Sequence, residues 1–375
     1  MRLLHHYISN YKHPLSKISK KTGIAENVLN SIITRDRLPT YPELKKLSYF
    51  FKAPISTLLK KLEDEKQANF LYRKAVDENV SISDIDRYNQ FITCVLELEC
   101  DSNRVAPIKE VFEIVDNTYA NAEVLARKFR LLFFNGNMVD PLIDLPKILS
   151  EKLGFIVKVL EGGNRVDGAS AFVNNWVFLF VSPRFIGRML FTLAHELAHI
   201  LNHHGEGDFI HLDEKIYENS KNVKGDQERF ANYFASALLL PIQGIAKMLN
   251  TLRKIQKIPP DAAIGDIEIL YIARFYGVSF DVVANRLEML DLIPEGGSYS
   301  LSQKLKENHG SAEKRANELE LPSRPITNFD ILPSFLVQKA LMLIDQGKYS
   351  SERIAQMLQI SIHRLMKYNA ELGRK

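Results

Sequence analysis

The feature that most constrains this chain of 375 residues is a polar motif set in an otherwise apolar helix. Residues 190–201 are apolar almost all round, and the exceptions include His195, Glu196 and His199. A helix that is apolar on every side is a buried helix. Two imidazoles and a carboxylate need partners when they are buried, because their removal from water unpaired costs several kcal/mol each. The sequence therefore predicts a buried helix that holds a cation.

The three polar side chains form an HExxH motif, whose spacing suits a tetrahedral metal ion. Residues four apart on a helix are offset by only about 40°, so His195 and His199 project from one side. Glu196 lies about 100° around the helix, where it can reach a water on the metal without binding the metal. We therefore expect a Zn²⁺ site, although Mn²⁺ or Fe²⁺ suits the same donors. The alternative interpretation is an amphipathic helix with polar residues on a wet face.

A hydrolytic metal site also needs a third protein ligand and an open coordination position. Position 205, ten residues after His195, is glycine, which excludes the third histidine of a metzincin. Glu228 is the better candidate because a helical projection aligns it with small and apolar residues, where a carboxylate needs a cation. The alternative is a buried Glu228 paired with an arginine or lysine. Six side chains remain candidates for stabilising a tetrahedral oxyanion: Arg184, His203, His204, His211, Tyr217 and Tyr233.

The surroundings of the motif resemble a known family. The segment 191–200, with the sequence FTLAHELAHI, is followed by Glu228 and by the pattern ANxFAxxLLxP over residues 231–241. Together they resemble the ImmA/IrrE metallopeptidases over residues 120–293. The resemblance implies that the two histidines and Glu228 bind the metal and that Glu196 is the general base. Members of that family are typically bacterial or phage proteins that cleave DNA-binding repressors.

The first sixty residues carry an excess of positive charge. They contain eleven Lys and Arg against three Asp and Glu, whereas the whole chain has a net charge of only +4. Apolar residues repeat at helical spacing on both sides of Gly23, which predicts two short helices joined by a tight turn. This segment resembles the XRE type of helix-turn-helix, and its charge favours duplex DNA as a partner.

In that interpretation the second helix enters the major groove of DNA. Its outward residues are expected to be Glu26, Asn27, Asn30 and Ser31. The basic side chains expected to hold phosphates are Lys17, Lys20, Lys21, Arg35 and Arg37. The base-reading helix starts with Glu26 and carries no Arg or Lys there, so the alternative is a helical domain that docks on a protein.

The C-terminal tail contains a weak repeat of the same pattern. A shift of 336 positions places residues 351–365 over residues 15–29 and aligns their apolar positions. Gln359 then takes the place of the turn glycine. We expect a helical hairpin of similar shape, which either binds DNA or serves in docking or dimerisation.

The expected fold is α+β and mostly helical, with a small sheet. Strands are predicted at residues 155–160, 171–173 and 176–181, the last two joined by a turn at Asn174-Asn175. If the strand at 176–181 lies at the edge of the sheet, it can pair with an extended substrate. The predicted parts are a helix-turn-helix domain (1–64), a helical connector (65–119), a zincin-like metallopeptidase domain (120–293), a linker (294–331) and a C-terminal helical, helix-turn-helix-like module (332–375).

Composition excludes several other classes of protein. Cys94 and Cys100 form no CxxC pair and no disulfide framework, which favours a reducing compartment. The N-terminus lacks the apolar core of a signal peptide, and the longest apolar run, residues 176–181, is far too short to span a bilayer. We therefore expect a cytoplasmic protein without a membrane partner, with a homodimer as a possible assembly.

Together these expectations describe a zinc-dependent endopeptidase fused to a DNA-binding domain. Its expected partners are duplex DNA and a protein substrate, a helix-turn-helix repressor whose cleavage changes transcription. One alternative is a DNA-binding regulator whose peptidase domain acts as a sensor or a protein dock. Another is the antitoxin or immunity component of a two-gene system. The intact Glu196 favours the enzyme, since a scaffold needs no general base beside the metal.

Overall fold

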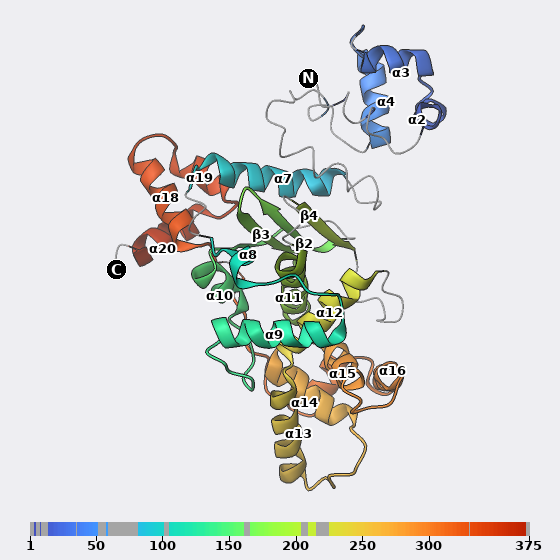
Figure 1. Cartoon of the computed structure of the whole chain (residues 1–375), viewed down its shortest axis with the longest axis vertical. Helices are drawn as coiled ribbons and strands as arrows, with labels where there is room; N and C mark the ends of the chain where they lie inside the picture. The colour runs from blue at the N-terminus through green and yellow to red at the C-terminus, as the bar shows by residue number, and fades with distance from the viewer. Residues whose placement is uncertain are drawn as a thin grey trace. The chain divides into compact units, whose positions relative to one another are not determined.

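The computed structural model shows a mostly helical chain with one small sheet (Figure 1). It describes Leu4, Ile8 and Leu58 and the ranges 14–34, 36–51, 82–100, 105–160, 166–203, 209–214, 225–329 and 331–372. The chain divides into two compact units, one made of residues 1–100, 162–165 and 339–375 and the other of residues 101–161 and 166–338. The expected α+β class is therefore confirmed. Within the described ranges, no helix combines the length and the apolar character needed to cross a membrane.

Over residues 14–51 of the first unit, the described chain forms the short helices α2 (Leu15–Thr22), α3 (Glu26–Ile33) and α4 (Tyr41–Phe51). Gly23 ends α2 with a φ of +65°, a left-handed conformation that glycine adopts without steric cost. Its N–H donates to the carbonyl of Ser19. The three helices share one apolar cluster, which includes Ile18, Leu29, Ile32, Leu44 and Leu47. The two helices predicted around Gly23 are confirmed.

The C-terminal part of the same unit contains a hairpin of similar shape. Helices α19 (Ser351–Met357) and α20 (Ile362–Leu372) begin 336 residues after the starts of α2 and α3. Gln359 has a φ of +49° at the position that corresponds to Gly23. Helix α7 (Ile82–Glu97) packs against α19. The weak sequence repeat is therefore a repeat of backbone shape.

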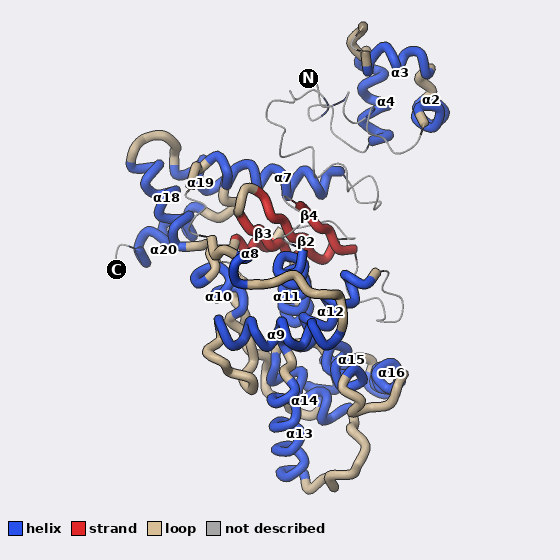
Figure 2. Tube along the Cα trace, viewed as in Figure 1, coloured by secondary structure: helices blue, strands red, loops and turns tan. Residues whose placement is uncertain are grey.

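The second unit is built on a mixed sheet of four strands (Figure 2). In order across the sheet they are β1 (Ile156–Val159), β3 (Trp176–Val181), β2 (Val166–Val173) and β4 (Phe209–Glu214). β1 runs parallel to β3, whereas β2 is antiparallel to both β3 and β4. Asn174-Asn175 forms the turn between β2 and β3, with φ angles of +51° and +65°. This hairpin is the one that the sequence predicted.

β3 is an interior strand, so the expectation that it forms an edge open to a substrate is wrong. It pairs with β1 on one side and with β2 on the other. All six of its residues are buried, as is typical of a strand covered on both faces. The outer strand next to β2 is β4, which among the described strands pairs with β2 alone.

The core of the second unit forms where helices pack against the sheet and against one another (Figure 1). Helix α11 (Ile186–His203) lies against β2 and β3 and carries the HExxH motif. Helix α12 (Asp226–Leu239) packs against α11 and also against α9 (Tyr119–Phe133). Leu193 and Leu197 on α11 are fully buried. The buried motif helix that the sequence predicted is confirmed.

Two buried arginines donate hydrogen bonds to main-chain carbonyls at the C-terminal end of α12. Arg130 donates from Nε to the carbonyl of Leu238 (2.7 Å), and Arg286 donates from Nε to the carbonyl of Leu240 (3.1 Å). Carbonyls at a helix end lack partners within the helix and carry a partial negative charge, so a cation stabilises them. Burial lowers the pKa of Arg130 to about 10, which still leaves it charged at neutral pH.

The predicted linker at residues 294–331 is wrong for most of its length. It contains the helices α16 and α17, and α16 packs against α15. The glycine-rich start of the segment is held to α15, because the Glu288 carboxylate accepts from the N–H groups of Gly296 (3.0 Å) and Ser298 (2.9 Å). The remaining described helices are α8 (Ile108–Val111), α10 (Leu145–Lys152), α13 (Ile242–Gln256), α14 (Asp266–Tyr276), α15 (Phe280–Met289), α16 (Gly297–His309), α17 (Ala312–Glu318) and α18 (Ser334–Asp345).

Candidate metal centre

Helices α11 and α12 bring three potential metal ligands together. His195 and His199 lie one turn apart on α11, and their Nε2 atoms are 3.1 Å apart. Glu228, in the first turn of α12, places Oε2 3.3 Å from His195 Nε2 and Oε1 3.6 Å from His199 Nε2. One ligand atom of each residue lies within 4.8 Å of the other two, so the group could hold a metal ion. These are the three residues that the sequence predicted as ligands.

The close packing of α11 and α12 depends on small side chains. Ala231 and Ala235 follow Glu228 on the same face of α12, and both are fully buried. On α11, Ala194 and Ala198 are buried in the same way. Small residues let two helices approach until groups on facing turns can share one ion. The face of α12 that carries Glu228 in a helical projection is therefore the face expected to lie against α11.

Asn232 on α12 orients His195. The distance between His195 Nδ1 and Asn232 Oδ1 is 3.0 Å. Because an amide oxygen only accepts hydrogen bonds, Nδ1 carries the proton and the lone pair of Nε2 faces the other ligands. Such outer partners fix the tautomer of a metal-binding histidine. No role was predicted for Asn232 from the sequence, although its place one turn after Glu228 puts both residues on one helix face.

Glu196 is fully buried between α11 and β2. β2 approaches the helix at Gly168, where a Cβ atom would lie 2.5 Å from Glu196 Oε1 and 2.5 Å from Thr192 Cγ2. That distance is shorter than any normal carbon contact, so glycine is needed to leave room for the carboxylate. Glu196 therefore follows His195 directly on α11 but does not belong to the three-residue group, as expected of a general base.

Strand β4 adds a fourth polar side chain, His211. Its Nε2 lies 2.9 Å from Glu228 Oε1, and its ring centroid lies 3.8 Å from that of His199. The side chain is 12% exposed. The sequence placed His211 only among six candidates for contact with an oxyanion, and the structure brings it to the metal group.

Two of the other five oxyanion candidates, Arg184 and Tyr233, have side chains that the structure describes, and both contact other partners. Arg184 forms an ion pair with Asp167 at 3.4 Å. Tyr233 packs edge-on against Tyr119, with ring centroids 5.3 Å apart. The side chain of His203 and the residues His204 and Tyr217 lie outside the described residues.

The donor set fits a divalent cation. Two neutral imidazoles and one carboxylate carry a total charge of −1, which a divalent ion converts to +1. The histidines are 1% and 0% exposed and Glu228 is 26% exposed, so most of the donor set is removed from water and is stabilised by a cation. Two nitrogens and one oxygen suit Zn²⁺, and Mn²⁺ and Fe²⁺ accept the same donors.

Seven of the nine residues predicted to contact DNA lie on α2 and α3. Lys17, Lys20 and Lys21 are exposed on α2. Glu26, Asn27 and Asn30 are exposed on α3, and Ser31 is half-buried there. The three lysines and the outward face of α3 are thus all accessible to a partner.

Arg37, which was predicted to hold a phosphate, is paired within the protein. It lies 2.6 Å from Glu43. Partial burial raises the pKa of Glu43, but hydrogen bonds from Arg37 and Thr40 outweigh burial and lower it on balance. A phosphate must therefore compete with Glu43 for this arginine. Arg35 lies outside the described residues.

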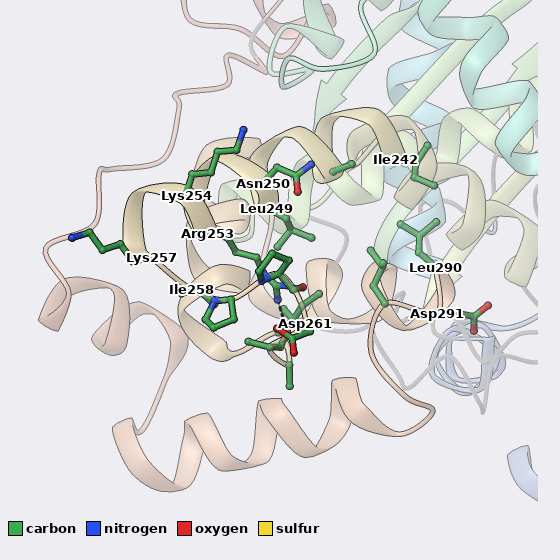
Figure 3. A pocket seen from close by; sticks show the side chains of 17 residues that line it. Ile242, Leu249, Asn250, Arg253, Lys254, Lys257, Ile258, Asp261, Leu290 and Asp291 are labelled. Carbon is green, nitrogen blue, oxygen red and sulfur yellow. Dashed lines mark hydrogen bonds between the residues drawn. The ribbon is translucent and has the colours of Figure 1, made fainter.

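A groove of about 940 Å³ lies elsewhere in the second unit, between α13, the loop after it and the end of α15 (Figure 3). Arg253 forms hydrogen bonds with α14 and with the loop. It donates from Nε to Glu268 of α14 (2.7 Å) and from Nη2 to the carbonyl of Ala262 in the loop (2.8 Å). Leu249 and Ile258 contribute to the apolar part of the lining. No residue of the metal group lines this groove, so it is separate from the candidate centre.

Comparison with known proteins leads to the same part of the chain. No curated protein matches this chain. Residues 178–288 match the model of the Peptidase_M78 family, described as an IrrE N-terminal-like domain. The match spans α11, β4 and α12 and so includes the whole metal group. The stretch that builds the candidate centre is therefore similar to a peptidase domain of the IrrE/ImmA kind.

Proposed function

We propose that this protein is a metal-dependent endopeptidase that uses Zn²⁺. The observation that carries the proposal is the convergence of His195, His199 and Glu228 from two helices, within a stretch similar to M78 peptidases. Glu196, buried beside this group, supplies the base that hydrolysis needs. A metal-dependent sensor or dock has no use for such a base, so we favour the enzyme over that alternative.

The side chains of the centre have distinct roles in this proposal. His195, His199 and Glu228 would hold the ion. A Zn²⁺ ion held there supplies Lewis acidity toward a water and a peptide carbonyl. Glu196 accepts a proton from the attacking water and returns it to the leaving amine nitrogen. The peptide C–N bond breaks, and the oxygen of water becomes part of the new carboxyl group.

The outer strand β4 favours an extended protein segment as the substrate. A substrate strand next to β4 would lie about 4.8 Å away and could form hydrogen bonds with the main-chain groups on the outer side of β4. Because β4 carries His211 beside Glu228, a chain bound to this edge passes close to the metal group. The scissile segment must leave any helix to bind in this way, so we expect cutting in an extended or loosely held region.

The basic N-terminal part favours a regulatory substrate. We infer that it binds duplex DNA or docks on a DNA-bound protein, and that the substrate is a helix-turn-helix repressor. Linking a binding module to a protease can raise the effective concentration of the substrate to about the millimolar range. Weak recognition of the peptide by the metal centre is then sufficient for selective cutting.

Incubation of the zinc-loaded protein with candidate repressors from its own genome tests the proposal. We expect a single cut in one repressor, mapped by mass spectrometry of the fragments, and no cut by the Glu196→Gln variant. Cleavage at a near-normal rate by that zinc-loaded variant would refute the role of Glu196 as the general base. Broad digestion of unrelated unfolded proteins would indicate a general protease, and an absence of cleavage for every repressor would favour the sensor or dock.

A further inference from the structure

His211 lies beside the candidate metal ligands, but none of the steps above requires it. It is the third residue of β4, and its side chain is mostly buried. Its Nε2 contacts Glu228 Oε1 at 2.9 Å, while its ring lies over that of His199 with 33° between the two planes. The ring therefore touches two of the three ligands, one through a hydrogen bond and the other through its face.

The distances place His211 outside the ligand group. Two ligands of one zinc ion, each about 2.0–2.2 Å from it, lie at most about 4.4 Å apart. Among the described side chains, the set whose ligand atoms all lie within 4.8 Å of one another consists of His195, His199 and Glu228. His211 is not in that set, so its Nε2 is placed to bind a ligand of the metal instead of the metal itself.

The two oxygens of Glu228 have different neighbours. Oε2 lies 3.3 Å from His195 Nε2, on the side of the ligand group. Oε1 is the atom that His211 contacts at 2.9 Å, and it lies 3.6 Å from His199 Nε2. A carboxylate only accepts hydrogen bonds, so the imidazole of His211 must donate its Nε2–H to Oε1. One oxygen of Glu228 therefore contacts β4, and the other faces His195 on the side of the ligand group.

We propose that His211 is a positioning residue that makes Glu228 a ligand through one oxygen. The inference rests on the proposed metal centre and adds a residue to it. By holding Oε1, His211 limits rotation of the carboxylate and presents Oε2 to the ion, and its contact with the His199 ring limits rotation of that imidazole. Hydrogen-bond partners of metal ligands commonly change metal affinity by about 10- to 100-fold when they are removed.

The sheet explains why His211 can reach this position. In the β2–β4 pair, Ser170 is the partner of His211, and paired residues project to the same face of a sheet. Ser170 lies two residues after Gly168, so both face α11, because Gly168 contacts Glu196 there. His211 therefore also faces α11. A shift of one residue in the β4 register would turn the imidazole to the opposite face.

Zinc affinity of the full-length protein tests this inference. After the metal is removed with a chelator, the dissociation constant for Zn²⁺ is measured by competition with a chromogenic chelator. We expect His211→Ala to weaken zinc binding by about 10- to 100-fold. We expect His211→Gln, whose side-chain amide can still donate to Glu228, to stay within a few-fold of the wild type.

A second histidine–carboxylate pair provides the matched control. His309 Nδ1 lies 2.8 Å from Glu318 Oε2 in the α16–α17 region, and neither residue belongs to the metal group. We expect His309→Ala to bind zinc like the wild type. Far-ultraviolet circular dichroism of each variant shows whether helix content is retained, and the glutamine variant keeps the test decisive if the alanine variant is unstable.

X-ray absorption of the zinc-loaded proteins separates positioning from direct ligation. We expect two imidazole nitrogens on the metal in the wild type and also in His211→Ala. Loss of one nitrogen in the variant, with no recovery in His211→Gln, would show that His211 is itself a ligand and would overturn the inference. Equal zinc affinity in His211→Ala and the wild type would also overturn it and leave the proposed metal centre intact. A wild type that binds no zinc would instead contradict the proposed function.

Discussion

Glu196 and Glu228 lie next to the same two histidines but are expected to do different work. Glu228 comes from α12 and has both oxygens near histidine nitrogens. Glu196 comes from α11, is fully buried against β2 and is not in the group that could hold an ion. Substitution of each residue should therefore affect a different measurement.

Replacement of the general base should separate metal binding from turnover. Glu196→Gln keeps the size and shape of the side chain but removes the proton acceptor. We expect zinc content and thermal stability close to the wild type and a fall of about 10²-fold or more in the rate of substrate cleavage. Metal analysis and a cleavage assay on the same preparation check this. A zinc-loaded variant with a near-normal rate would refute the role of Glu196.

Replacement of the third ligand should affect the metal first. Glu228→Ala removes the one carboxylate of the group, and we expect zinc affinity to fall by more than about 100-fold. Asp226 is the matched control, because it lies in the same turn of α12 but is 72% exposed and pairs with Arg229. We expect Asp226→Ala to bind zinc normally in the same chelator competition. Equal zinc stoichiometry and affinity in both variants would exclude Glu228 as a ligand.

At the scale of elements, the centre depends on three contacts between helices and strands. β2 comes close to α11 at Gly168, α12 comes close to α11 along alanines, and β4 pairs with β2. Each contact positions a different group, because β2 bounds the space of Glu196, α12 carries Glu228 and β4 carries His211. Changes far from the ion can therefore alter the centre by moving one element.

The contact between β2 and α11 predicts the effect of one methyl group. Gly168→Ala places a Cβ atom 2.5 Å from Glu196 Oε1, so the carboxylate must move away. We expect loss of cleavage with zinc affinity retained, together with a stability loss of about 1–3 kcal/mol from overpacking. Chemical denaturation and the two assays above measure these effects.

Gly265 is the control for this substitution, because no atom lies within 4 Å of the Cβ position there and its φ is −104°. We expect Gly265→Ala to keep both activity and zinc affinity. If Gly168→Ala were as active as the wild type, Glu196 would have more room than the structure shows, and its proposed placement would be wrong.

The hydrogen bonds of Arg286 at the end of α12 are expected to contribute to the free energy of unfolding. Arg286 is fully buried and donates to the Leu240 carbonyl, to Tyr119 and to Glu123. Burial raises the pKa of Tyr119 to about 12, so its hydroxyl stays protonated at neutral pH and remains part of this network. Arg286→Met leaves these groups without their cation, and we expect a loss of about 2–4 kcal/mol in the free energy of unfolding.

A surface arginine provides the comparison for Arg286. Arg229 is 48% exposed and pairs with Asp226, and Arg229→Met should cost less than about 1 kcal/mol. Urea denaturation of both variants measures the difference. If both variants lost the same free energy of unfolding, the hydrogen bonds of the buried Arg286 would not stabilise the end of α12.

At the scale of the whole molecule, the chain joins a peptidase-like unit to a unit with two helical hairpins. Residues 1–60, which include the first hairpin, carry a net charge of +8, whereas residues 351–372 of the second hairpin carry +1, although the two backbones share one pattern. A polyanion and a protein are both possible partners for such hairpins, and charge is the property that separates them. The proposed DNA partner therefore depends on side chains and cannot be inferred from backbone shape.

Salt-dependent DNA binding checks this proposal. We expect the full-length protein to bind duplex DNA with an affinity that falls steeply as salt rises. Substitution of Lys17, Lys20 and Lys21 by alanine should weaken binding to all sequences and reduce the salt slope by about one for each lost phosphate contact.

Lys254 and Lys257 are the control for the lysine variants, because they are exposed on α13 and at its end in the other unit. Alanine at these two positions should leave DNA binding unchanged in a titration followed by fluorescence anisotropy. No binding by the wild type at about 50 mM salt would favour docking on a protein.

The sequence by itself determined the features that depend on neighbours along the chain. The positions of His195 and His199 on one helix face, the turn at Gly23 and the Asn174-Asn175 hairpin all follow from local periodicity and backbone preference. Glu228 could be chosen as well, because its own helix shows which residues share its face. The repeat at 351–365 could be found for the same reason, even though Gln359 replaces glycine.

Only the tertiary structure decided which elements meet. The interior place of β3 depends on strand pairing with β1. The polar segment 297–318 is helical because α16 packs against α15 and α17 packs against α16, which its sequence does not predict. His211 lies 17 residues before Glu228 on a strand with both polar and apolar residues, so no local pattern singles it out among nearby histidines. Its contact with Glu228 exists because β4 pairs with β2 in one register and β2 packs on α11. Contacts of this kind depend on the arrangement of several elements at once, which local periodicity cannot specify.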